Sequence, residues 1–588
     1  MFSRLVPILS VLLVALGPVC AIWPAPRSYT KGNSTLYLHQ NIYITYNGEF
    51  LPYMAGYVPQ SINSKEIVQA GVSRALESIF TDKFVPWMLH KRNRLSTFEP
   101  DVFKGQNWMK SLKIVQTTQD TASTFKPLAG EVDESYNLTI SAQGDATLTA
   151  VSSTGVLRGL ETFTQLFYQH SSGTFWYTND APLSIQDAPK FPHRGVLLDV
   201  ARNWYGVDDI LRTIDAMGWN KMNRLHIHVT DSQSWPIDIP SMPEVAREGA
   251  YCPDCKYSAE DVQNMQLYGL YRGVEVYFEI DMPGHIGSLE WSHPELIVAY
   301  DAFPYYWWCA EPPCGAFKLN DSRVDAFLEK MFDDLLPRLE PYAAYFHAGG
   351  DELNANDSML DPGIRSNATE VLQPLLQKFV DTQHSRVRKA GLTPMTWEEI
   401  PLDWNVTIGN DTVVQTWLGG ASVKTLTGMG HKVIDSDYNY WYLDCGRGQW
   451  LSMENGEAYQ NFYPFGDWCD PFKNWHLIYS HDPTFNLTAD EAKLVLGGEV
   501  AIWSEQIDAV ILDGIIWPRA SAAGEVLWSG RIDEATGQNR SQLDATPRLA
   551  EMRERMVARG VGAAPVQMIW CTQADNATEC SYPMGPGL

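Results

Sequence analysis

From residue 191 onward, short apolar runs alternate with longer stretches of helical periodicity. Eight runs have the length and composition of buried strands: residues 194–200, 224–229, 274–280, 344–350, 394–399, 413–419, 433–439 and 498–505. Helices are expected between them, at residues 207–217, 323–339 and 370–390. Strands that alternate with helices pair in parallel, so the pattern predicts an α/β fold, a (β/α)8 TIM barrel over residues 191–588 with a C-terminal extension. A doubly wound sheet is the alternative, but it does not require eight strands, and the chain has no glycine-rich phosphate loop.

Ahead of the barrel the pattern is different. Residues 112–117, 136–142 and 146–152 alternate like strands, and residues 155–170 have apolar side chains at helical spacing. This predicts a smaller α+β domain, assigned to residues 96–190, without a catalytic constellation. Residues 22 to about 110 show no regular pattern, and we expect them to be irregular.

The N-terminus has the features of a secretory signal. Arg4 precedes an apolar run over residues 5–16, which is too short to span a bilayer, and Val19-Cys20-Ala21 resembles a cleavage site. We therefore expect a signal peptide at residues 1–21 and a secreted, extracellular protein. Eight cysteines remain after its removal, in four short windows, and the pairing is left open. Ten N-x-[ST] sequons predict glycosylation: Asn33, Asn137, Asn320, Asn356, Asn367, Asn405, Asn410, Asn486, Asn539 and Asn576.

The composition excludes two classes of partner. The net charge of the 588-residue chain is -26, from 44 Lys and Arg against 70 Asp and Glu. So acidic a surface repels nucleic acid and anionic membranes, and neither is expected as a partner. Aromatic residues make up 12% of the chain, with 21 Trp. Their flat faces suit the stacking of sugar rings as well as a core.

Carboxylates, one histidine and aromatic residues recur at the ends of the predicted strands. Barrel enzymes place their reacting groups there. The mixture suits a neutral polyol better than a phosphate, because carboxylates bind hydroxyls and aromatic faces stack on sugar rings. In chain order, the residues of these types at the ends of the predicted strands are Asp231, Asp281, His285, Asp351, Glu352, Trp397, Trp417, Tyr442, Asp444, Trp503 and Glu505.

The adjacent acids Asp351 and Glu352 indicate the type of reaction. Most glycosidases place two carboxylates on opposite sides of the scissile bond. Neighbours in sequence cannot easily flank a bond in that way. One acid with an adjacent helper instead fits a scheme in which the substrate supplies its own nucleophile.

Several long motifs resemble one family. HAGGDE at 347–352 is similar to the H-x-G-G-D-E signature of glycoside hydrolase family 20, the β-N-acetylhexosaminidases. HRGVLLDVARNW at 193–204, HIHVTDSQSW at 226–235 and DMPGH at 281–285 match family segments as well. The resemblance extends over roughly residues 112 to 560 and is strongest to the secreted fungal enzymes. It implies an exo-acting enzyme for oligosaccharides that end in N-acetylhexosamine.

The resemblance also implies roles for individual residues. Glu352 matches the general acid/base, and Asp351 matches the residue that orients the 2-acetamido group in a retaining, oxazolinium mechanism. Asp231 and His285 match the pair that hydrogen-bonds toward the acid/base. The positions that match substrate-binding residues are Arg194, Trp397, Trp417, Tyr442, Asp444, Trp503 and Glu505, although Arg194 lies at the start of its predicted strand rather than at its end.

Further expectations come from the family. The small domain is expected to have a zincin-like topology, residues 22–95 to include a propeptide that stays bound after cleavage, and the enzyme to form a homodimer without cofactor or metal. The basic pair Lys91-Arg92 is the candidate cleavage site, and an ordinary basic surface loop is the alternative for this segment. Two alternatives remain: an inactive sugar-binding relative, and a metal-dependent hydrolase built on His226 and His228, whose spacing zinc hydrolases also use. We favour core positions for both histidines.

Overall fold

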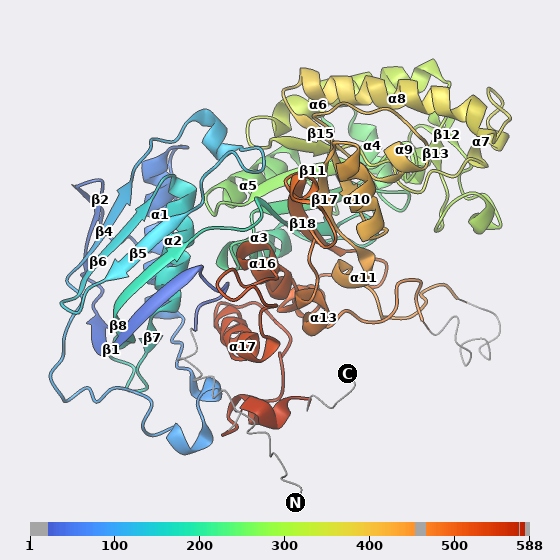
Figure 1. The fold of residues 1–588 in the computed structure, drawn as a ribbon. Helices are drawn as coiled ribbons and strands as arrows, with labels where there is room; N and C mark the ends of the chain where they lie inside the picture. Colours follow the sequence, from blue (N-terminus) through green and yellow to red (C-terminus); the bar gives the residue numbers. More distant parts are fainter. Residues whose placement is uncertain (1–20, 453–465, 576, 583–588) are drawn as a thin grey trace, which may run out of the picture.

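The computed structural model describes residues 21–452, 466–575 and 577–582, in two packed units. The first is a mixed sheet with helices α1 (Ser64–Thr81) and α2 (Ser153–Gln165) on the side that faces the second unit (Figure 1). Its main path runs β1 (Ser28–Leu38), β8 (Trp176–Asp187), β5 (Tyr136–Ile140), β6 (Asp145–Ala150), β4 (Ser111–Gln116), β2 (Tyr43–Tyr46) and β3 (Glu49–Phe50), and β7 (Tyr168–Gln169) pairs with β8. The predicted small domain ahead of the barrel is confirmed.

The expectation that residues 22 to about 110 are irregular is wrong. Strand β1 pairs antiparallel with β8, and α1 begins at the N-cap Asn63, whose side chain accepts a hydrogen bond from the Glu66 amide. The register of β1 shifts between Lys31 and Leu36, and most of this edge strand is not buried. An irregular edge strand gives no period-two pattern of apolar residues, which explains why the sequence did not show it.

The second unit is a closed parallel barrel, as predicted. Its strands are β9 (His193–Asp199), β10 (Arg224–Thr230), β11 (Glu275–Ile280), β14 (Tyr345–His347), β15 (Thr393–Trp397), β16 (Val413–Thr416), β17 (Lys432–Asp435) and β18 (Val495–Ile502), and β18 pairs with β9. Every residue of β9, β10, β11 and β18 is buried. Burial on both faces is what parallel strands require, and it explains their nearly continuous apolar sequences.

The longer helices that accompany the barrel strands are α3 (Val207–Trp219), α5 (Ala259–Leu270), α6 (Ser322–Leu339), α8 (Thr369–Lys389), α10 (Gly420–Gly428) and α16 (Arg519–Ser529), and α17 (Gln542–Ala558) follows. Local sequence fixes where some of them begin. Helix α5, for example, starts in a capping box in which Ser258 and Asp261 exchange hydrogen bonds. Among the described residues, no helix is both long and apolar enough to cross a membrane.

Polar contacts join the two units. The Arg158 guanidinium donates to the Gly273 carbonyl at 2.6 Å, and the fully buried Lys221 ammonium lies 2.9 Å from the Asp187 carboxylate. Trp528 of α16 packs into the core of the first unit. The small domain is therefore attached firmly to the barrel.

Four disulfides close short loops. The pairs are Cys252–Cys255, Cys309–Cys314, Cys445–Cys469 and Cys571–Cys580. These account for all eight cysteines that follow Cys20. The sequence left the pairing open, and the structure assigns each cysteine to the partner in its own window.

Candidate active site

A cavity of about 320 Å³ opens where the barrel strands end. This is near the lower end of the range of ~300–1,000 Å³ for small-molecule sites, so the cavity suits one sugar ring better than a chain of them. Nine of the eleven predicted site residues line it: Asp231, His285, Asp351, Glu352, Trp417, Tyr442, Asp444, Trp503 and Glu505. The structure thus brings together residues that are up to 274 positions apart (505 − 231).

A chain of ionisable groups leads to the Glu352 carboxyl. His285 Nδ1 lies 3.2 Å from Asp231 Oδ1, and His285 Nε2 lies 3.4 Å from Glu352 Oε2. Burial acts to lower the pKa of His285, but the carboxylates of Asp231, Asp281 and Asp351 raise it well above its usual range. The raised pKa favours the imidazolium form of His285, and its two ring nitrogens link Asp231 to Glu352.

The backbone around Glu352 takes conformations that most residues avoid. Glu352 and His285 both have positive φ values, 52° and 51°, in the left-handed region. Such strain is tolerated mainly where function requires it. Gly349, with φ 66°, is required here as well, because a Cβ at this position would lie 1.8 Å from Asp281 Oδ1. The glycines ahead of the two acids thus allow strands β11 and β14 to end in close contact.

Asp351 lies behind Glu352 and next to a second buried acid. Burial and the neighbouring Asp351 carboxyl raise the pKa of Asp281 well above its usual range, and the Gly350 amide donates to Asp281 Oδ1 at 2.9 Å. Burial also raises the pKa of Asp351, while the His285 imidazolium acts to lower it. Because two adjacent buried carboxyls do not both ionise readily, the pKa of each is raised, and that of Asp281 more strongly.

Aromatic rings form one wall of the cavity. Trp417 and Tyr442 lie nearly parallel with centroids 6.3 Å apart, and Trp503 lies 6.2 Å from Tyr442. Trp397 belongs to the same cluster, but it is fully buried and does not line the cavity. Its indole N–H donates to Glu279 at 2.7 Å. Trp397 therefore supports the wall from behind, which corrects the expectation of direct contact with a sugar.

The cavity lining also includes acidic side chains and an arginine, Arg202, that was not among the predicted site residues. Burial raises the pKa of Asp444 to about 7, and burial and Glu311 raise that of Glu505 well above its usual range. Arg202 Nη2 lies 2.9 Å from Asp231 and 2.6 Å from Glu311. Arg202 follows the C-terminal end of β9 within HRGVLLDVARNW, and that position at the rim is the signal that could have identified it.

Arg194 does not reach the cavity. It is fully buried at the opposite, N-terminal end of β9, where it contacts Glu134 of the small domain at 2.6 Å and donates to the Lys221 carbonyl at 2.8 Å. Arg194 and Arg158 hold the pKa of Glu134 at about 2, against the opposing effect of burial. The expected contact with sugar hydroxyls is corrected accordingly: Arg194 joins the two units, because it lies at the start of β9, the strand whose far end forms the rim.

This placement leads to a first prediction. Replacing Arg194 with Gln leaves a buried Glu134 with a single ionic partner, so we expect stability to fall by about 3–5 kcal/mol. The KM for a small substrate should change less than twofold. Urea unfolding followed by Trp fluorescence, together with steady-state kinetics of the folded enzyme, measures both. Arg202→Lys is the matched control and should affect kinetics more than stability. A raised KM for Arg194→Gln at unchanged stability would contradict the assignment.

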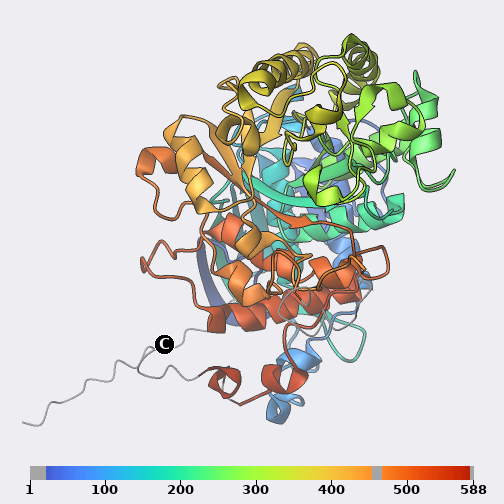
Figure 2. The ribbon, with the colours of Figure 1, turned by 90° about the vertical axis from the view of Figure 1, so that its right-hand side faces the viewer.

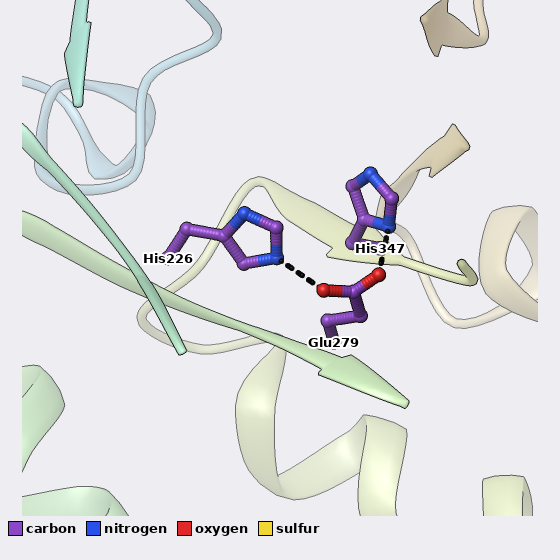
Figure 3. A group of neighbouring side chains, drawn as sticks. All are labelled: His226, Glu279 and His347. Atoms are coloured by element: carbon purple, nitrogen blue, oxygen red, sulfur yellow. Dashed lines mark ion pairs between the residues drawn. The ribbon is translucent and has the colours of Figure 1, made fainter. Parts of the chain in front are cut away.

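The histidines with the spacing of zinc ligands lie in the barrel core. His226 and His228 are at most 1% exposed, and His226 Nε2 lies 3.1 Å from Glu279 Oε2. His347 approaches the other oxygen of Glu279 at 3.0 Å (Figure 3). His228 Nδ1 lies 2.7 Å from Glu279 as well. One buried carboxylate thus pairs with three imidazoles, which accounts for the H-x-H motif by ion pairing in the core.

Comparison with known proteins gives the family. Residues 191–531 match the model of the glycosyl hydrolase family 20 catalytic domain, and residues 22–166 match a domain described as "beta-acetyl hexosaminidase like". The chain belongs to glycosyl hydrolase family 20. It is a glycoside hydrolase of the β-N-acetylhexosaminidase type, as its motifs predicted.

Relatives of this family 20 enzyme match over most of its length. A β-hexosaminidase from Arthroderma benhamiae is 39% identical, over 96% of this chain and 98% of the relative. A chitooligosaccharidolytic β-N-acetylglucosaminidase from Ostrinia furnacalis is 34% identical, over 77% of this chain and 76% of the relative. Among solved structures, a chitobiase from Flavobacterium johnsoniae superposes with a TM-score of 0.69 at 25% identity, covering 92% of this chain and 73% of that one.

Proposed function

We propose that this enzyme removes terminal non-reducing N-acetylhexosamine, GlcNAc and also GalNAc, from chito-oligosaccharides and glycans by a retaining, substrate-assisted mechanism. The observation that carries the proposal is the position of Asp351 and Glu352 side by side at one cavity sized for a single sugar. No second carboxylate is then needed across the scissile bond, because the substrate's acetamido group supplies the nucleophile.

In the first step, the carbonyl oxygen of the 2-acetamido group attacks C1 while the bond from C1 to the glycosidic oxygen breaks. Glu352 donates its proton to the departing oxygen, and Asp351 stabilises the positive charge that develops on the acetamido nitrogen of the oxazolinium. Trp417, Tyr442 and Trp503 enclose the acetamido group. Arg202, Asp444 and Glu505 bind the ring hydroxyls and set the orientation.

In the second step, the Glu352 carboxylate accepts a proton from a water molecule whose oxygen attacks C1. The bond from C1 to the acetamido oxygen breaks, and the N-acetylhexosamine leaves with its β-configuration retained. Glu352 ends the cycle protonated, as it began. Asp231 and His285 position Glu352 throughout, and one residue serves as acid and then as base.

A single assay tests this function. The enzyme should release p-nitrophenol from p-nitrophenyl β-N-acetylglucosaminide, with inhibition by a thiazoline that mimics the oxazolinium and no effect of a chelator. The corresponding β-glucoside, which lacks the acetamido nucleophile, is the control and should not be cleaved. Equal cleavage of both glycosides would rule out substrate assistance, and loss of activity with chelator would favour the metal-dependent alternative.

We also propose that the enzyme is secreted and glycosylated. Four disulfides are typical of proteins from oxidising compartments. Eight of the nine sequon asparagines that the structure describes are exposed, and Asn356 is half-buried. The predicted signal peptide lies almost wholly outside the described residues, as does Asn576. A shift to lower mass on treatment with a glycosidase that removes N-glycans would test the glycosylation.

A bound propeptide and a homodimer complete the proposal. The Lys91-Arg92 segment lies beside the C-terminal tail, where Asn93 donates to Asp575 at 3.1 Å (Figure 2). Strand β1 and helix α1 precede it and belong to the sheet unit, so cleavage there would leave the first part attached by β1–β8 pairing. We expect two fragments in denaturing electrophoresis and one particle, of dimer mass, in native light scattering. A single uncut band would exclude processing.

A further inference from the structure

The barrel interior contains a layer of ionisable side chains directly beneath the active site. In the strand register, His228 of β10 lies beside Asp199 of β9 and Glu279 of β11, and Glu279 lies beside His347 of β14. All four side chains are at most 1% exposed. Barrel interiors are more often filled with branched apolar residues. Burying several charged groups here is costly, and the cost suggests that the layer has a function.

This layer is continuous with the acid/base. His228 Nδ1 lies 2.7 Å from Glu279 Oε2, and its Nε2 lies 2.9 Å from Asp231 Oδ2. Asp231 Oδ1 then faces His285, which contacts Glu352 as described above. A connected series of short polar contacts thus runs from Glu279 through His228, Asp231 and His285 to Glu352.

We infer that Glu279 is a positioning residue for Glu352: by holding His228 as a cation, it keeps the Asp231 carboxylate ionised and aimed at His285. The inference rests on the proposed function. It adds two residues of the barrel core, Glu279 and His228, to the series of contacts that ends at Glu352. Glu279 does not line the cavity, and it acts only through its neighbours.

The charges around His228 support this role. Burial acts to lower the pKa of His228, but the Glu279 and Asp231 carboxylates raise it well above its usual range. Burial acts to raise the pKa of Glu279, but His347 and His228 lower it well below its usual range. The charged or titratable groups that face this pair are Asp199 and Arg202 at the end of β9, His226 on β10, Asp231 after β10, Asp281 after β11, His347 on β14 and, through His226, Glu499 on β18.

Replacing Glu279 with Gln tests the inference while keeping the shape of the side chain. His228 then loses one of its two carboxylate partners, so its pKa should fall. As the pH rises, His228 becomes neutral and Asp231 loses a charged donor. We expect the alkaline limb of the kcat/KM profile to shift to lower pH by about one unit or more. We also expect kcat to fall on the order of 10-fold, because the general acid Glu352 is misplaced.

A leaving-group comparison separates positioning from simple structural damage. Loss of acid catalysis should slow the hydrolysis of p-nitrophenyl β-N-acetylglucosaminide much more than that of the 2,4-dinitrophenyl analogue, whose leaving group needs no proton. Glu499→Gln is the matched control. Glu499 is an equally buried carboxylate that contacts His226 at 3.2 Å and His193 at 2.7 Å, without a contact to His228 or Asp231 among the described residues. We expect it to preserve the pH profile and the ratio of the two rates.

The outcomes are distinct. A wild-type pH profile and leaving-group ratio for Glu279→Gln would overturn the inference, as would identical behaviour of Glu279→Gln and Glu499→Gln. If Glu279→Gln does not fold, His228→Gln provides the second variant. It should lower the rate for the p-nitrophenyl substrate selectively at every pH, because glutamine cannot supply a cation to Asp231. Absence of activity in the wild-type enzyme would instead reject the proposed function.

Discussion

Replacing Glu352 with Gln should lower kcat for p-nitrophenyl β-N-acetylglucosaminide by about 10²–10⁴-fold, the usual contribution of a general acid/base. Glutamine has nearly the same shape as glutamate but has no proton to give to the glycosidic oxygen and cannot accept one from water. The Glu352 side chain is 32% exposed, so the change should leave stability almost unaffected. Steady-state kinetics and thermal unfolding of the two proteins measure these effects.

The dependence on the leaving group provides the control. With the 2,4-dinitrophenyl glycoside, bond cleavage needs no proton. The rate of the first step should therefore fall far less than with the p-nitrophenyl substrate. Added azide should restore turnover, because azide attacks the oxazolinium without a base and gives a β-glycosyl azide. Equal losses with both substrates, or near-normal turnover of the variant, would show that Glu352 is not the acid/base.

Replacing Asp351 with Asn should lower kcat by about 10²–10³-fold, the size expected when one group that stabilises developing charge is removed. Asp351 lines the cavity and is itself buried beside Asp281 and His285, and burial strengthens its interaction with a positive charge. The variant should also bind the thiazoline inhibitor much more weakly, since it no longer stabilises the mimicked cation. Inhibition constants and kcat measured on the same preparation provide both values.

Product binding distinguishes this role from general damage to the site. N-acetylglucosamine carries no developing charge, so its affinity for Asp351→Asn should fall far less than that of the thiazoline. Glu352→Gln is the matched variant and should bind the thiazoline almost as well as the wild type. Parallel losses in thiazoline and product binding would mean that Asp351 shapes the cavity without stabilising the oxazolinium.

Much of the site could be predicted because strand ends are local features. The carboxyl ends of parallel strands meet at one rim of a barrel, so the residues that follow each apolar run were expected to lie together. Ten of the eleven residues at these strand ends line the cavity, from Asp231 after β10 to Glu505 after β18. The same reasoning should have favoured Arg202 over Arg194, since only Arg202 follows its strand.

The sequence by itself determined the eight-stranded barrel, the small domain ahead of it and the adjacent acids at the rim, because each depends on periodicity or on neighbours along the chain. Only the tertiary structure decided the role of β1 in the sheet, the place of Trp397 behind the wall and the ion pair of Arg194 with Glu134. It alone also revealed the contact of Glu279 with His228 and that of His228 with Asp231. These features depend on the distances between side chains of different strands and on burial, and both are fixed only when the barrel closes.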